Sequence, residues 1–174
     1  MSELARWIHE RVPANADLDR PALVRLAMEL GREPRFWRHL VRHDPETRHY
    51  VQLYRDPHLD VWLICWLNAQ DTGYHDHDVS SGAVYVCEGT LLEDHFERGA
   101  DGWIREVTCA HHAGSFFDFD SSYIHGVRHA GGPPATSIHV YSPALWRMGH
   151  YEPGVSGALG RISITYADEL ASAG

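Results

Sequence analysis

Apolar residues in the first part of the chain recur with the period of an amphipathic helix over 4–12, 21–30 and 33–43. Asp19 suits the N-cap of the second stretch, which has a proline in its first turn, and Gly31 is placed to end it. The third stretch stops at an Asp-Pro pair. These stretches predict a helical cap, in which the aromatic residues pack against the rest of the protein.

From residue 50 onward, the period of the apolar positions changes to the alternation of β-strands. Stretches 50–55 and 59–67 flank the turn residues Asp56, Pro57 and His58, which predicts a hairpin. Many short strands separated by turn residues favour an antiparallel sandwich or barrel, and we expect a double-sheet jelly roll. The further strands are expected at 83–87, 90–98, 103–108, 114–118, 126–129, 136–142 and 161–166.

The length of 174 residues is typical of one domain. We expect a single domain over 1–174, mainly β, with the helical cap at 1–47 and a β-barrel at 48–174. The formal net charge of −9 argues against a protein that follows nucleic-acid phosphates. The three cysteines form no Cys-x-x-Cys pair and are too few for a disulfide framework, so we expect reduced thiols. The chain shows no membrane-spanning apolar run and no signal-peptide pattern, so we expect a cytoplasmic protein that binds no membrane.

Two histidines, His75 and His77, lie two positions apart in a run that alternates like a β-strand. Residues two apart in a strand point to the same face, so the two imidazoles converge. His125 follows in a second strand-like segment and can bring a third imidazole. The same alternation turns Asp76 and Asp78 to the opposite face, where we expect them to be exposed to solvent. The sequence thus predicts a metal site made of the three histidines.

The absence of a carboxylate from this expected ligand set has a chemical consequence. Three neutral imidazoles leave a divalent ion with its full charge and with open positions that accept an anionic ligand and dioxygen. A thiolate is the natural anion for iron in such a site. Zinc with three histidines and a water is the competing chemistry, and ligand type alone does not separate the two.

Three polar residues, Ser137, His139 and Tyr141, alternate within the strand expected at 136–142. They share one face of that strand, so a hydroxyl, an imidazole and a phenol can form one hydrogen-bonded row. A polar row inside an apolar sheet needs an explanation, and we expect it to belong to the active site.

The two histidine segments resemble the two motifs of the cupin superfamily. After the His-x-His pair, the family has a glutamate ligand where this chain has Gly82, and the later glycine of the motif is present as Gly89. The second motif keeps its first glycine, Gly114, and its histidine, His125. With the Ser-x-His-x-Tyr row beside these motifs, residues 48–166 closely resemble the cysteine dioxygenase family.

This resemblance implies a cupin fold and a mononuclear non-haem Fe(2+) enzyme that adds both atoms of dioxygen to the sulfur of a small thiol, giving a sulfinic acid. It implies that the three histidines hold the iron and that Tyr141 hydrogen-bonds to the substrate carboxylate or to the dioxygen. His139 would orient Tyr141, and Ser137 would orient His139. The expected partners are a small thiol and O2, and the protein is expected to be a monomer or a weak homo-oligomer.

The chain departs from animal members of that family at Gly82. Those members have a cysteine at the matching position, linked by a thioether to the tyrosine that matches Tyr141. With glycine here the crosslink cannot form, and Tyr141 is expected to be a free phenol, as in bacterial relatives.

The substrate is expected to be L-cysteine or a mercapto acid such as 3-mercaptopropionate. In the family, an arginine that pairs with the cysteine carboxylate lies two residues after the tyrosine matching Tyr50, and this chain has Gln52 there. A glutamine resembles the mercapto-acid branch, with Arg55 as the alternative residue for the same contact. We expect Gln52 and Tyr50 at the carboxylate end, and Ile64 and Ile164 on the apolar wall.

Two other functional classes remain open. One is a metal cupin of another kind, an isomerase or a lyase, whose activity would consume no oxygen. The other is a non-enzymatic cupin that binds a small molecule and a metal but forms no sulfinate.

Overall fold

The computed structural model describes residues 1–153 and 159–165. Its helices are α1 (Glu3–His9) and α2 (Arg20–Gly31), followed by two 3-10 turns, η1 (Pro34–Phe36) and η2 (Arg38–Leu40). The predicted N-cap is confirmed, because the Asp19 carboxylate accepts a hydrogen bond from the backbone N–H of Ala22 at 2.9 Å.

The prediction of a third α-helix over 33–43 is wrong. The chain there forms only η1 and η2, which are separated by Trp37 in a non-helical conformation with φ −132°. The Trp37 side chain is buried in the core beneath the helices. The buried Trp37 residue, held in this non-helical conformation, interrupts the regular helical repeat.

Eleven strands occur in the described residues, and most lie where the alternation predicts them. The hairpin of β1 and β2 is confirmed, with Tyr50 opposite Ile64. The strand of Arg147–Pro153 was not predicted, and residue 166 at the end of the last predicted strand lies outside the described residues. The strands are β1 (His49–Arg55), β2 (Asp60–Trp66), β3 (Tyr74–Asp76), β4 (Ser81–Glu88), β5 (Thr90–Arg98), β6 (Ile104–His112), β7 (Phe116–Phe119), β8 (His125–His129), β9 (Ala135–Ser142), β10 (Arg147–Pro153) and β11 (Leu159–Thr165).

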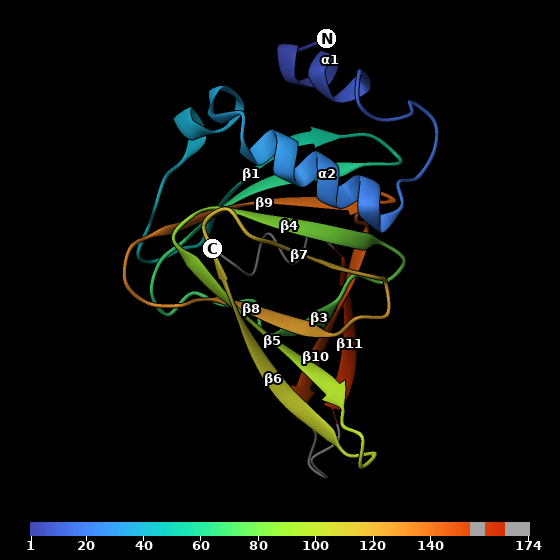
Figure 1. The fold of residues 1–174 in the computed structure, drawn as a ribbon, viewed down its shortest axis with the longest axis vertical. Helices are drawn as coiled ribbons and strands as arrows, with labels where there is room; N and C mark the ends of the chain where they lie inside the picture. Colours follow the sequence, from blue (N-terminus) through green and yellow to red (C-terminus); the bar gives the residue numbers. More distant parts are fainter. Residues whose placement is uncertain (154–158, 166–174) are drawn as a thin grey trace.

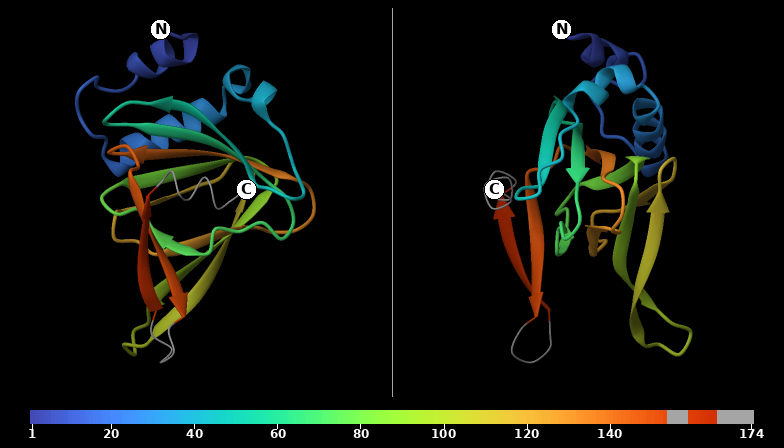
Figure 2. Two further views of the ribbon diagram at one scale, coloured as in Figure 1. Left: turned by 180° about the vertical axis from the view of Figure 1, so that it is seen from behind. Right: turned by 90° about the vertical axis from the view of Figure 1, so that its left-hand side faces the viewer.

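The strands form two antiparallel sheets, in the orders β1-β2-β9-β4-β7 and β11-β10-β3-β8-β5-β6. The predicted double-sheet jelly roll with N-terminal helices is therefore confirmed (Figure 1). The β5–β6 and β10–β11 hairpins extend away from the helices, at the opposite end of the molecule (Figure 2). The division into a cap at 1–47 and a barrel at 48–174 within one domain stays a prediction, and residues 166–174 lie outside the described part.

Two apolar cores share the first sheet. On its outer face, α2 packs against β4, β7 and β9 (Figure 1) and helps to bury a cluster that includes Leu63, Tyr85 and Val140. On its inner face, a second cluster that includes Trp66 and Phe119 fills the space toward the other sheet. Because successive strand residues face opposite ways, β9 sends Ile138 and Val140 to the outer core and Ser137, His139 and Tyr141 to the inner face. No helix within the described residues is both long and apolar enough to cross a membrane.

Candidate functional site

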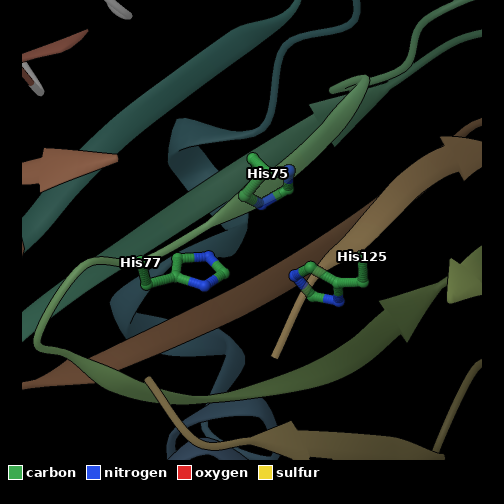
Figure 3. A group of neighbouring side chains, drawn as sticks. All are labelled: His75, His77 and His125. Carbon is green, nitrogen blue, oxygen red and sulfur yellow. The ribbon is translucent and has the colours of Figure 1, made fainter. Parts of the chain in front are cut away.

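Three buried imidazoles from two neighbouring strands converge at the inner face of the second sheet (Figure 3). β3 and the residues after it carry His75 and His77, and the first residue of β8 is His125. Backbone pairing places His75 directly opposite His125. One ring nitrogen from each of the three lies within 4.8 Å of the others, and the residues are 1–4 % exposed.

The outer nitrogens of two of these rings are held by protein acceptors. His75 Nδ1 lies 3.1 Å from the carbonyl oxygen of Gly73, and His125 Nδ1 lies 2.8 Å from Glu93 Oε1. An acceptor at Nδ1 keeps the proton there, which leaves the lone pair on Nε2. His77 Nδ1 is buried with no hydrogen-bond partner among the described residues, while its ring stacks on Phe119 with centroids 4.4 Å apart.

Two histidines of the cluster, His75 and His77, have a lowered pKa, which favours the neutral form that binds a metal. Burial, and then the neighbouring His125, lower the pKa of His75 well below its ordinary value. Burial and both neighbouring histidines do the same to the pKa of His77. Neutral imidazoles with converging lone pairs are the donors that divalent iron and zinc bind, so the residues present fit such an ion.

A hydrogen-bonded row lies along the inner face of β9, across from the histidines. Ser137 Oγ is 2.8 Å from His139 Nε2, and His139 Nδ1 is 3.1 Å from the Tyr141 hydroxyl. Burial lowers the pKa of His139 to about 3, so its ring is neutral in the physiological range. The Tyr141 ring centroid lies 5.2 Å from that of His77, which places the phenol beside the histidine cluster.

A cavity of about 50 Å³ joins the histidine cluster to the polar row. His75, His77, His125, His139 and Tyr141 all line it. The rest of the wall is mainly apolar, and includes Trp62, Ile64, Val84, Phe119, Val127, Leu145 and Met148.

The residues expected at the substrate divide into two groups. Tyr50 and Ile64 line the cavity. Ile164 is half-buried and packs against the inner core, and Gln52 is exposed, with its amide donating to Asp60 at 3.0 Å. The structure does not bring either of these two side chains to the cavity wall. Arg55 does not belong to the described residues that line the cavity either. Its guanidinium is paired with Asp60.

Sequence reasoning overlooked Arg48, which lines the cavity from the residue before β1. Its Nη1 donates to the backbone carbonyl of Asp71, and its guanidinium lies 5.0 Å from the ring centroid of Trp66. Among the described lining residues, Arg48 bears the only permanent charge. The signal in the sequence is the two-residue spacing of Arg48 and Tyr50, since extended residues two apart point the same way.

Two further contacts of the site were also missed. Trp66 donates its indole N–H to Ser137 Oγ at 2.9 Å, which extends the polar row by one residue. Glu93 is buried behind His125. Its signal in the sequence is a carboxylate at an inward position of an alternating strand, between Leu91 and His95.

The prediction that Asp76 is exposed to solvent is wrong. Asp76 does face away from the histidine cluster, but the β10–β11 hairpin covers it and leaves it 5 % exposed. Its carboxylate accepts hydrogen bonds from Arg161 Nε at 2.6 Å and from the Tyr151 hydroxyl at 2.7 Å. Although burial would raise the pKa of Asp76, these bonds outweigh burial and hold the pKa far below its ordinary value.

Comparisons with solved structures found several similar proteins. A cupin superfamily protein from Desulfitobacterium hafniense matches with a TM-score of 0.52 and 6 % identity, over 63 % of this chain and 89 % of that one. A protein from Thermus thermophilus matches with a TM-score of 0.49 and 23 % identity, over 61 % and 92 % of the two chains. An RmlC-like cupin with a double-stranded β-helix from Methanocaldococcus jannaschii has a TM-score of 0.48 and 12 % identity, over 59 % and 86 %. The match to the Desulfitobacterium hafniense protein supports the cupin architecture.

The family is shown by a separate comparison. The model of the family described as cysteine dioxygenase type I matches residues 2–153, which include both histidine segments and the whole of the polar row. The chain therefore belongs to the cysteine dioxygenase type I family.

Proposed function

We propose that this protein is an Fe(II)-dependent thiol dioxygenase that converts a small thiol carrying a carboxylate into the corresponding sulfinate. Family membership and the three-histidine cluster support a metal-dependent oxidoreductase. The observation that carries the proposal is a single cavity bordered by three ligand histidines, the Tyr141 phenol and the Arg48 cation. In the reaction, both oxygen atoms are added to sulfur, and the electrons that sulfur loses are those that dioxygen gains.

His75, His77 and His125 would hold the ferrous ion. When bound, the ion would favour the thiolate form of the substrate and would supply the redox chemistry for dioxygen. The protein contributes a buried, apolar wall that excludes water from the reacting sulfur. Three neutral ligands also leave the site with a net positive charge, which suits an anionic substrate.

The polar row orients a phenol toward the substrate. Neutral His139 holds the Tyr141 oxygen by one hydrogen bond, and Ser137 holds the other nitrogen of the same ring. In this arrangement Tyr141 would donate its O–H to the substrate carboxylate or to the dioxygen. Its phenol is expected to carry no thioether, because the backbone neighbour of Tyr141 on β4 is Gly82.

Arg48 would bind the substrate carboxylate, in the role first expected of Gln52. A guanidinium pairs with a carboxylate through charge-assisted hydrogen bonds, which are stronger than those of a neutral amide. No carboxylate occurs among the described residues that line the cavity, so the wall offers no ion pair to a substrate ammonium group. A cavity wall with a cation for the carboxylate but no anion for an ammonium group favours a mercapto acid such as 3-mercaptopropionate over L-cysteine.

Product analysis tests the proposal. The protein is loaded with ferrous iron under anaerobic conditions, mixed with a thiol, and then exposed to air, while oxygen uptake and product mass are followed. We expect stoichiometric oxygen uptake and a sulfinate, with 3-mercaptopropionate preferred over L-cysteine and cysteamine. A metal cupin with isomerase or lyase activity would consume no oxygen, and a binding protein would return each thiol unchanged. Either result would refute the dioxygenase.

A further inference from the structure

Glu93 lies in the second sheet, directly behind the histidine cluster. It is an inward-facing residue of β5 and is 4 % exposed. Its Oε1 is 2.8 Å from His125 Nδ1, and its Oε2 is 3.0 Å from His111 Nε2. Each carboxylate oxygen therefore accepts a hydrogen bond from a different imidazole.

A buried carboxylate is costly unless both oxygens have donors, so this arrangement specifies the donors. His125 must carry a proton on Nδ1 to donate to Glu93, and in the neutral ring that binds a metal the lone pair is then on Nε2, toward His75 and His77. The other neighbours of the His125 ring include Phe119 and Tyr123, with centroids 4.6 Å and 5.4 Å away. These rings restrict the position of the imidazole, but they do not select its tautomer.

We propose that Glu93 is the positioning residue of the metal centre, fixing the tautomer and orientation of His125 and thereby raising metal affinity. His111 acts as the second anchor of the carboxylate, with its ring packed on Phe117 at a centroid distance of 4.3 Å. The inference rests on the proposed metal site at His75, His77 and His125. Outer partners of this kind change metal affinity by about 10- to 100-fold when removed.

Two substitutions separate the charge of Glu93 from its hydrogen bond. Glu93→Gln keeps the shape and one acceptor, and the partly exposed His111 can change tautomer to accept from the new amide. Glu93→Leu removes both acceptors. Glu97→Gln is the matched control, because Glu97 lies four residues along the same strand and contacts His95 instead of a ligand histidine.

The primary measurement is the affinity of the folded protein for Co²⁺, titrated without thiol and without oxygen. We expect affinity to fall about 10-fold in Glu93→Gln and about 100-fold in Glu93→Leu, with no change in Glu97→Gln. Nitrogen-15 NMR of the imidazoles in the metal-free protein should find His125 protonated at Nδ1 in the wild type and in Glu93→Gln, and mixed tautomers in Glu93→Leu. Wild-type Co²⁺ affinity in a folded Glu93→Leu variant would overturn the inference. If that variant fails to fold, wild-type affinity in Glu93→Gln together with an Nε2-protonated His125 in the wild type overturns it.

These readouts are independent of the proposed reaction. A wild-type protein that binds Co²⁺ with the expected dependence on Glu93, but forms no sulfinate, would refute the dioxygenase and keep this inference. A protein that forms sulfinate and binds Co²⁺ equally well without Glu93 would support the dioxygenase and refute this inference.

Discussion

The indole N–H of Trp66 donates a hydrogen bond to the hydroxyl oxygen of Ser137, with nitrogen and oxygen 2.9 Å apart. An indole can only donate, so this contact favours a Ser137 hydroxyl whose own proton is directed to His139 Nε2. A neutral His139 then carries its proton on Nδ1 and donates to Tyr141. The direction of the whole row is thereby set by a residue that does not line the cavity.

Trp66→Phe should lower kcat for thiol oxidation by about 10-fold, because the Ser137 hydroxyl is then free to rotate and His139 can exchange tautomers. KM should change less, since Trp66 does not touch the cavity. Steady-state kinetics with 3-mercaptopropionate measure both constants. The control is Trp7→Phe, which removes a buried indole from the outer core beneath the helices. Full kcat in Trp66→Phe would show that the row needs no such donor.

Arg48→Met should raise KM for a carboxylate-bearing thiol by roughly 10- to 100-fold, because a charge-assisted hydrogen bond contributes about 1.5–3 kcal/mol. Cysteamine has no carboxylate, so its KM should be nearly unchanged in the same variant. Arg55→Met serves as a second control, since that guanidinium pairs with Asp60. Equal increases in KM for the carboxylate-bearing thiol and for cysteamine would mean that Arg48 stabilises the fold and does not bind the substrate carboxylate.

Gly82→Ala should destabilise the protein by about 1–3 kcal/mol, the usual range for overpacking a core. A Cβ at Gly82 would lie 2.4 Å from two ring atoms of Phe119, and that ring is buried and stacks on His77. Urea denaturation of the metal-free protein gives the change in the free energy of unfolding. Gly160→Ala is the control, because its nearest neighbour would be the Glu152 carbonyl oxygen at 3.9 Å. A stable Gly82→Ala variant would indicate that Phe119 can move without cost.

Asp76→Asn should lower the free energy of unfolding by about 1–3 kcal/mol at pH 7, through the loss of charged hydrogen bonds to Arg161 and Tyr151. Because the pKa of Asp76 is held below its ordinary value in the folded state, its contribution is complete above the unfolded pKa, near 4. That contribution is lost as the pH falls toward the folded pKa.

The difference in stability between wild type and Asp76→Asn should therefore narrow below about pH 4. Denaturation at a series of pH values checks this dependence. Asp101→Asn breaks an exposed ion pair with Arg105 and should change the free energy of unfolding much less than Asp76→Asn does. If the difference in stability between wild type and Asp76→Asn did not change with pH, the explanation by the Asp76–Arg161 ion pair would be contradicted.

Cys65 and Cys87 should resist alkylation at pH 8, whereas Cys109 should react first. Burial, followed by the nearby Glu88, raises the pKa of Cys87 to about 12, and burial also raises the pKa of the Cys65 thiol. Since only the thiolate is nucleophilic, both should react slowly until the protein is denatured. Cys109 is partly exposed on β6. Iodoacetamide labelling followed by peptide mass spectrometry gives the order in which the three cysteines react. Rapid labelling of Cys65 in the native protein would contradict the prediction.

The sequence by itself determined the features that depend on local periodicity. Strand alternation placed His75 and His77 on one face, and it put Ser137, His139 and Tyr141 in one row. These relationships hold within a few residues of one strand, so no knowledge of the sheet order was needed. The spacing of strands and turns was likewise sufficient for the jelly-roll architecture.

Only the tertiary structure decided which side chains from different strands meet. β10 was not foreseen, because its sequence has a glycine and a proline and little alternation, and it becomes a strand by pairing with β3 and β11. That pairing buries Asp76 against Arg161. The choice of Arg48 over Gln52 at the cavity, and the contact of Glu93 with His125, depend on the register and packing of separate strands. A local pattern specifies the face of a strand to which a residue points, whereas long-range pairing and packing specify what it meets there.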